Sequence, residues 1–257
     1  EMSADRLAYD ITQKDPSLGI DSAQTSDSAD LALTGEITLP EGIDLMSLQN
    51  TAAFVAALRA GLGISFEATQ GISTGEAVEN NPMMPVSVAY TAAPGTTSVT
   101  ANAEVFDVST TVEGLDLTLR PPMVPMPVTA TTGAFGVGMA MPVATGEEAG
   151  EYGLQITMEN LVLDDAAWGM IDAGNVLDHG PLDVALDLGG LVKVDVLDLM
   201  LAGETGAPPA TAPEMQSLDI RTLAIQALGA MATGTGSFTF DNSMVAMGGP
   251  PLPVGTA

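Results

Sequence analysis

Short runs in which apolar and polar residues alternate recur along most of this 257-residue chain. In an extended strand successive side chains point to opposite faces, so each run would bury one face and expose the other. Glycine, proline, asparagine and aspartate separate the runs, as they do in antiparallel sheets. We therefore predict a mainly β, α+β fold built of antiparallel sheets. The runs are 31–39, 86–90, 98–105, 115–119, 153–158, 184–188, 218–226 and 236–240.

The last two runs predict a specific pairing. We expect 218–226 and 236–240 to form adjacent antiparallel strands joined around 229–234. Phe238 and Phe240 stand two residues apart, so they should share one strand face and be buried together. Truncation of a buried phenylalanine costs about 3 kcal/mol, and we expect this cost for Phe240→Ala.

One stretch near the N-terminus has helical spacing. Its apolar residues recur at steps of three and four, which predicts a helix near 45–62. Asp44 or Ser47 can cap its start, because a short side-chain oxygen accepts hydrogen bonds from free backbone amides. Gly61 or Gly63 can end it.

A second, shorter helix is expected near 164–172. Acidic residues stand at its start, where they would face the positive end of the helix dipole. The same stretch carries Trp168, the single tryptophan of the sequence.

Four prolines between residues 121 and 127 divide the chain. Proline cannot donate to a strand ladder, so this stretch should be an extended edge or a connector. We expect an N-terminal β-rich part with one helix, 1–120, and a C-terminal β-rich part, 121–257. A second exposed loop is expected at 204–213 because glycine, alanine, threonine and proline dominate it.

Charge and composition exclude several classes of function. The chain has 33 acidic and 6 basic residues, a formal net charge of −27. Nucleic acid is itself densely anionic, so we exclude it as a direct partner. No run approaches the ~20 apolar residues of a membrane-spanning helix. Cysteine is absent, which excludes disulfides, thiolate nucleophiles and cysteine-bound metal.

Residues suited to catalysis are few. Ser73 stands in a Gly-Ile-Ser-Thr-Gly match to the nucleophile-elbow motif, but residues 76–85 do not read as the helix that such an elbow requires. A catalytic triad would combine Ser73 with His179, the sole histidine, and with Asp178 or Asp183. We expect instead a polar turn at Ser73 and a histidine bonded to a nearby carboxylate or carbonyl.

Carboxylate pairs carry little information in so acidic a chain. Asp164 with Asp165, and Glu147 with Glu148, are neighbours that a hydrolase could use, but a solvated acidic surface is the more ordinary explanation. One histidine, no cysteine and no calcium-binding or phosphate-binding loop predict neither a metal nor a cofactor.

Methionine is the residue type that could mark a binding surface. The chain has 15 methionines and few aromatic residues, and thioethers adapt to irregular apolar partners. Met123, Met126, Met139 and Met141 flank or follow the proline-rich stretch, and they are our candidates for lining an apolar ligand pocket. Ordinary strand packing is the competing interpretation.

Two blocks of the C-terminal half carry a family resemblance. The first covers 161–168, 171–172 and 177–189, and the second covers 223–229 and the run Thr-Gly-Thr-Gly-Ser-Phe-Thr-Phe-Asp-Asn at 233–242. They resemble the alphaproteobacterial family called domain of unknown function 2125. The resemblance implies a secreted, periplasmic, β-rich protein with a removed signal peptide and a continuation beyond Ala257. It implies no activity, and its architecture resembles periplasmic lipid-handling scaffolds.

We therefore expect a non-enzymatic periplasmic scaffold or binding protein with an apolar ligand, such as a lipid, or a protein partner. Two alternatives remain. One is a hydrolase that uses Ser73 with His179 or a carboxylate pair. The other is a structural subunit of an extracellular assembly, joined through exposed edge strands.

Overall fold

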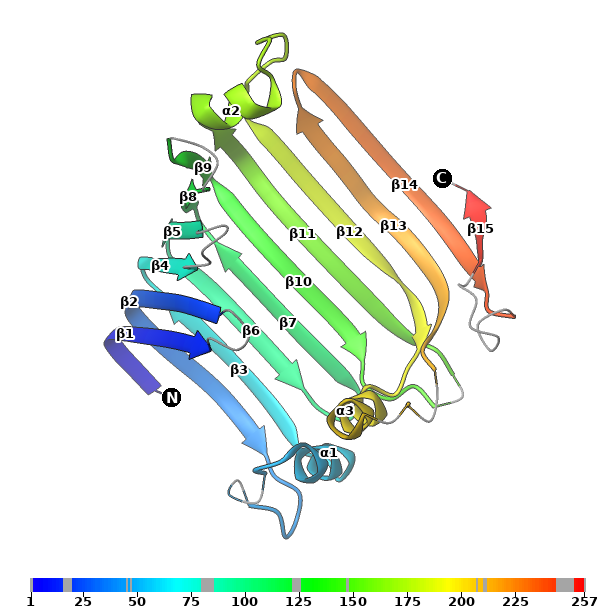
Figure 1. The fold of residues 1–257 in the computed structure, drawn as a ribbon. Helices are drawn as coiled ribbons and strands as arrows, with labels where there is room; N and C mark the ends of the chain where they lie inside the picture. Colours follow the sequence, from blue (N-terminus) through cyan, green and yellow to red (C-terminus); the bar gives the residue numbers. More distant parts are fainter. Residues whose placement is uncertain are drawn as a thin grey trace.

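The computed structural model is β-rich, as the alternating runs predict, and its strands form one large antiparallel sheet with three helices (Figure 1). It describes residues 2–15, 20–44, 46, 48–79, 86–121, 126–146, 148–206, 208–209, 212–243 and 252–256. The strands are β1 (Met2–Asp15), β2 (Ile20–Thr38), β3 (Gly63–Gln70), β4 (Ser73–Glu79), β5 (Val86–Ala92), β6 (Gly95–Ala101), β7 (Val105–Val112), β8 (Leu115–Arg120), β9 (Val128–Thr132), β10 (Ala134–Pro142), β11 (Gly150–Leu163), β12 (Leu182–Lys193), β13 (Glu214–Ala227), β14 (Ala230–Asp241) and β15 (Leu252–Thr256). The helices are α1 (Thr51–Arg59), α2 (Asp165–Ile171) and α3 (Val196–Thr205).

In much of the sheet the chain bends at short corners between consecutive strands, and these corners lie beside one another. After residues 71–72 the chain passes from β3 into β4, and after 93–94 from β5 into β6. In the same way 113–114 separate β7 from β8, and Gly133 separates β9 from β10. On one side of these corners β3, β6, β7 and β10 pair in a row, and on the other side β4, β5, β8 and β9 do so. We call the line of corners the crease.

Two long strands pass through the crease without a break. β2 pairs with β4 over residues 22–28 and with β3 over residues 32–38. β11 pairs mainly with β10 and then, at Val162 and Leu163, with β9. Each bends at one residue with left-handed φ, Asp30 (49°) in β2 and Asn160 (56°) in β11. These strands therefore join the two halves of the meander at both ends.

Backbone hydrogen bonds continue across the crease. The amide of Gly71 donates to the carbonyl of Ala29 over 2.9 Å, and the amide of Ala93 donates to the carbonyl of Gly114 over 2.9 Å. Buried backbone groups without partners are costly. The bend is therefore made with paired corner residues and does not open the sheet.

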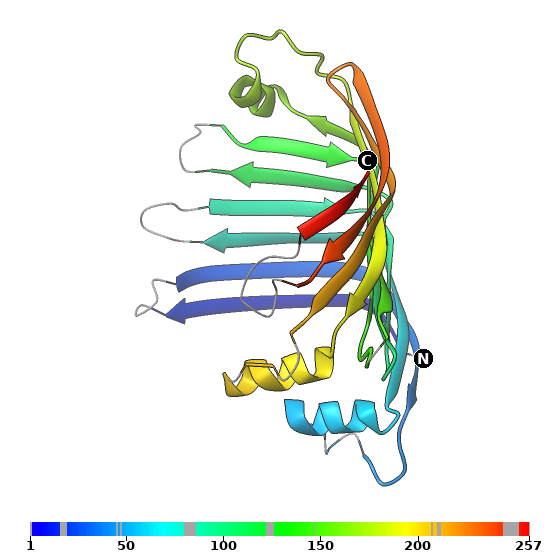
Figure 2. The same cartoon turned by 90° about the vertical axis from the view of Figure 1, so that its right-hand side faces the viewer.

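The crease divides the sheet into two planes. We call β4, β5, β8 and β9, with the part of the β1–β2 hairpin that lies beside β4, the arm. The remaining strands, with residues 32–38 of β2 beside β3, form the main sheet. Figure 2 shows the arm strands projecting from the main sheet toward one side, the side from which α1 and α3 also project. The main sheet thus has a walled inner side and a free outer side.

The fully buried core lies where the helices meet the main sheet. Its buried members come from α1, from α3 and from the segments beside them: Val55, Ala57, Leu58, Leu62, Val143 and Leu197. Ile64 of β3 and Phe106 of β7 pack against this cluster. Helix α1 begins after Asn50, whose side chain accepts from the amide of Ala53, and Gly61 (φ 105°) follows its end.

The predicted hairpin at the C-terminal end is confirmed. β13 and β14 are adjacent and antiparallel, and Leu228 and Gly229, both with positive φ, make the turn between them. This two-residue turn is tighter than the expected connection over 229–234. Phe238 and Phe240 share a face, as predicted, but both are half-buried rather than fully buried.

Three features differ from what the sequence predicts. The first helix starts at Thr51 and is capped by Asn50, so Asp44 is not its cap, and Ser47 lies outside the described residues. The run 98–105 contains a turn at 102–104. The segment α3 was not expected as a helix. The proline-rich stretch connects β8 and β9, which pair with each other, and a connector is one of the two forms expected of it.

The position of this core predicts which truncations cost the most folding stability. Leu62 is 0% exposed, so Leu62→Ala should leave a cavity and cost about 3 kcal/mol. Phe240 is larger but half-buried, so Phe240→Ala should cost about 1–2 kcal/mol, less than the value expected from sequence. Denaturant midpoints followed by circular dichroism measure both costs. A larger cost at Phe240 would contradict a core centred on the helices.

Candidate functional site

The two faces of the main sheet differ sharply in chemistry. The strand register places one residue per strand in a row across β3, β6, β7, β10, β11, β12 and β13, and cross-strand partners lie on the same face. One such row, the inner row, is Phe66, Val99, Val108, Met139, Leu154, Leu188 and Ile220. The adjacent row on the opposite face, the outer row, is Glu67, Ser98, Ser109, Gly138, Gln155, Asp187 and Thr222.

The inner row lies on the walled side of the sheet. Ile64 and Phe106, which pack against the helix core, have the same strand parity as Phe66 and Val108 of the row. The helices and the arm project from this side (Figure 2). We call this surface the inner face. It is apolar and concave, whereas the outer face is polar.

The inner face is not packed into a closed core. Met139 at the centre of the inner row is 38% exposed, and the other members of the row are half-buried. Ile37 of β2, which pairs with Ile64, is 50% exposed. Large continuous apolar surfaces are rare on free monomers and mark sites of interaction.

One cavity lies on the inner face. It has a volume of about 240 Å³ and is lined by Met2, Leu33, Gly35, Glu36, Ile37, Ile64, Ser65 and Phe66. A Cβ atom on Gly35 would lie 2.8 Å from Cβ of Phe66, so the glycine leaves room for the phenylalanine. Ligand pockets measure about 300–1,000 Å³, so this one suits a slender apolar group.

The structure separates the three candidate methionines that it describes. Met139 and Met141 lie two residues apart on β10 and share the inner face, opposite Val108 and Phe106. Met126 lies in the connection between β8 and β9 and is 63% exposed. Met123 lies outside the described residues. None of the described three lines the apolar cavity.

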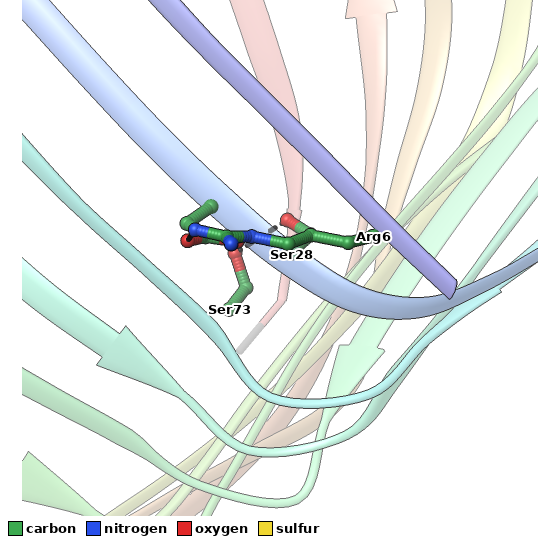
Figure 3. Close-up of polar contacts among 4 residues, drawn as sticks. Arg6, Ser28 and Ser73 are labelled. Carbon is green, nitrogen blue, oxygen red and sulfur yellow. Dashed lines mark hydrogen bonds and ion pairs between the residues drawn. The ribbon is translucent and has the colours of Figure 1, made fainter. Parts of the chain in front are cut away.

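Ser73 is the first residue of β4, and its hydroxyl pairs with that of Ser28 on β2 over 2.9 Å (Figure 3). Both serines are buried beside the crease. A strand follows Ser73, not the helix of a nucleophile elbow. Arg6 of β1, drawn beside them, forms an exposed ion pair with Asp27 that lowers the pKa of this carboxyl through its hydrogen bond.

His179 is held in a different cluster, beside α2. Its Nε2 lies 3.2 Å from Oδ2 of Asp172, and its ring stacks on Trp168 with centroids 4.2 Å apart. A bond to a nearby carboxylate is thus confirmed, although the partner is not Asp178 or Asp183. No hydrogen bond of the described residues joins His179 to Ser73.

Two aspartates of the α2 region accept hydrogen bonds from backbone amides. The pKa of Asp172 is lowered, first by the amide of Leu177, which donates over 2.8 Å, and further by His179. Asp164 caps α2 through Ala167 and also accepts from Thr129, which lowers its pKa.

The described part of the chain brings no group of three or more metal-ligating side chains together. Asp164 belongs to the helix cap and Asp165 to the first turn of α2, while Glu147 lies outside the described residues. Among the described residues no helix is long and apolar enough to cross a membrane.

No protein-family model matches the chain, and no curated protein or solved structure is detectably similar to it.

Sequence reasoning missed the inner face as a unit. Alternation shows that a strand has an apolar side, but the register between strands decides which apolar side chains lie next to one another. Ile37 and Ile64 are 27 positions apart in sequence and become direct partners. The alternating run 31–39 carried a signal of this face, because its apolar residues include Ile37, which the structure leaves exposed.

The α2 cluster predicts an acid-sensitive contribution to stability. A lowered pKa at Asp172 means that its contribution is full above the ordinary aspartate pKa of about 3.9 and is lost as the pH falls through the folded value. The free energy of unfolding of wild type minus that of Asp172→Asn should therefore be positive at pH 7 and shrink below pH 4. Urea titrations from pH 2.5 to 7 measure this difference. A difference that does not change with pH would contradict the assignment.

Proposed function

We propose that this protein is a non-enzymatic binding protein that holds an apolar ligand, such as a lipid chain, on its inner face. The observation that carries the proposal is the inner row, which has one apolar residue on each of the main-sheet strands β3, β6, β7, β10, β11, β12 and β13 and no fully buried member. Burial of apolar surface is worth about 25 cal/mol per Å², so covering this face gives a large driving force.

The shape of the face favours a slender ligand over a second copy of the chain. Two copies that met through this face would bring concave surfaces together, and a two-fold interface requires self-complementary patches. Each copy would also carry a formal charge of −27, which opposes close association. An alkyl chain lies along the face without either cost.

The proposal includes a periplasmic location. It rests on the resemblance of residues 161–189 and 223–242 to a secreted family, which also implies a signal peptide. The hydrolase alternative receives no support from Ser73 and His179, because each has a separate partner, Ser28 and Asp172. For this reason we propose no catalytic step.

A structural subunit remains the second candidate, on one observation. β1 pairs with β2 along its length, and no described strand pairs with its other edge. Such an edge can recruit a strand from another chain. However, Asp5, Arg6 and Asp10 place charges along β1, and charged edge strands resist pairing. Size-exclusion chromatography across a range of concentrations would reveal such an assembly.

A matched pair of variants on β2 tests the binding site. Ile37 lines the apolar cavity of the inner face, whereas Thr34 has the opposite parity and lies on the outer face. Both side chains are exposed, so each should accept an aspartate without unfolding. Ile37→Asp should weaken binding of the uncharged dye Nile red about fivefold or more, because a carboxylate must lose water beside the dye.

Thr34→Asp adds the same charge and should leave dye affinity close to that of wild type. Fluorescence titration gives the affinities, and circular dichroism confirms the fold of each variant. Absence of dye binding by wild type, or equal affinities for wild type and Ile37→Asp, would refute the inner face as the site.

A further inference from the structure

A hollow interrupts the polar outer face of the main sheet. It has a volume of about 290 Å³, and its floor is formed by Gly138 and Ala140 of β10 and Gly153 of β11. Strand parity places this floor on the side opposite Met139 and Leu154 of the inner row. Larger polar side chains of β7, β11, β12 and β13 surround the floor. The outer face can therefore hold a small polar molecule.

Arg221 of β13 forms one wall of the hollow. The register between β12 and β13 shifts after Asp187, and Arg221 is the residue left without a cross-strand partner. Such bulges re-aim side chains and are frequent beside functional sites. The guanidinium lies over Gly189, where an added Cβ atom would stand 2.9 Å from Nε of Arg221. The glycine therefore makes room for the guanidinium on the outer face.

The N–H groups of Arg221 are not taken up by the described part of the chain. Its ion-pair partner is Asp187, with 3.6 Å between Nη1 and Oδ1, which is too long for a hydrogen bond. Oδ1 of Asp187 is buried and has no hydrogen-bond partner among the described residues. A guanidinium presents its donors in a fixed fork that matches a carboxylate. This wall is therefore suited to the carboxylate of a ligand.

Asp107 forms the opposite wall of the hollow, on β7. Its carboxylate has no hydrogen-bond or ion-pair partner among the described residues, so it is suited to an ammonium group. The strands β10 and β11 separate β7 from β12. With about 4.8 Å between neighbouring strands, Asp107 and the guanidinium over Gly189 stand about 14 Å apart. After a hydrogen bond of about 3 Å at each end, about 8 Å remains between the two charged groups of a ligand.

This reach matches a short peptide. An extended chain spans about 3.3–3.6 Å per residue, so two or three residues cover about 7–10 Å. Gln155 of β11 lies between the two walls, and its side-chain amide has no hydrogen-bond partner among the described residues. An amide both donates and accepts, and a peptide group offers the complementary acceptor and donor.

We propose that the hollow on the outer face binds an extended dipeptide or tripeptide through its two charged ends. Arg221 binds the carboxylate, Asp107 binds the ammonium group, and Gln155 bonds to a peptide group between them. Such a ligand has no net charge, so the formal charge of −27 on the protein does not repel it. This site is separate from the inner face and goes beyond the proposed function.

Calorimetric titration with triglycine tests the proposal, in 150 mM NaCl to limit diffuse attraction to the acidic surface. Three compounds each lack one recognised group. Triglycine amide lacks the carboxylate, N-acetyltriglycine lacks the ammonium group, and 7-aminoheptanoate keeps both ends without a peptide group. Each should bind about fivefold or more weakly than triglycine. No binding of triglycine, or equal affinity for triglycine and any of the three, would overturn the proposal.

Matched variants locate the site. Arg221→Gln and Asp107→Asn each remove one charge, and Gly138→Val fills the floor without a change of charge. An added Cβ atom on Gly138 would meet no atom closer than 3.7 Å, so the strand should accept the valine. Each variant should weaken triglycine binding about fivefold or more. Arg120→Gln and Asp116→Asn make the same charge changes on β8 of the arm, outside the hollow, and should leave the affinity unchanged.

The remaining outcomes are equally decisive. Circular dichroism confirms the fold of each variant. Equal loss of affinity in the hollow and arm variants would show diffuse attraction to the surface and would overturn the proposal. Nile red binding by Gly138→Val should match that of wild type, because the valine lies on the outer face. A loss of peptide binding therefore does not imply failure of the inner-face function.

Discussion

The crease determines the rest of the structure. Because the meander turns at the same level at 71–72, 93–94, 113–114 and Gly133, the sheet folds into an arm and a main sheet and does not continue flat. Paired backbone groups, such as Gly71 with Ala29, keep the hydrogen bonding of the sheet continuous at the corner. A shift of one strand by one residue would carry its apolar side chains to the opposite face. The aligned corners therefore also help to keep the apolar sides of the main-sheet strands on the inner face.

The distribution of burial follows from this geometry. The helix core around Val55, Leu62 and Leu197 is closed at one end of the main sheet, while the inner row beyond it is at most half-buried. Burial is thus concentrated at the helices, and a large apolar area of the inner face is left partly exposed. In an interior with few aromatic residues, unbranched Met139 can adapt to ligands of irregular shape.

Local spacing made most strands and the short helix with Trp168 predictable from sequence. The long-range register between strands was not predictable in this way. Alternation identified β5, β8 and β12, and the short helix with Trp168 was expected near its observed place. Helix α3 was missed because Val196, Leu197, Leu199, Met200 and Leu201 are apolar on nearly every side, so no single helical face stands out. A carboxylate partner was expected for His179, but the sequence did not identify Asp172, which lies seven positions away and approaches through a loop. The inner face depends on which strands pair, and local alternation within each run does not reveal that pairing.

The central claim is that an alkyl chain occupies the inner face. Methyl spectra of protein labelled with ¹³C at methionine test it directly, in a titration with an uncharged dodecyl amphiphile that carries a nitroxide at the end of its chain. Met139 and Met141 lie on the inner face, and Met126 lies in the connection between β8 and β9. The account predicts that the Met139 and Met141 signals broaden at low ligand concentration while the Met126 signal persists. Equal broadening of all three, or broadening of Met126 alone, would contradict it.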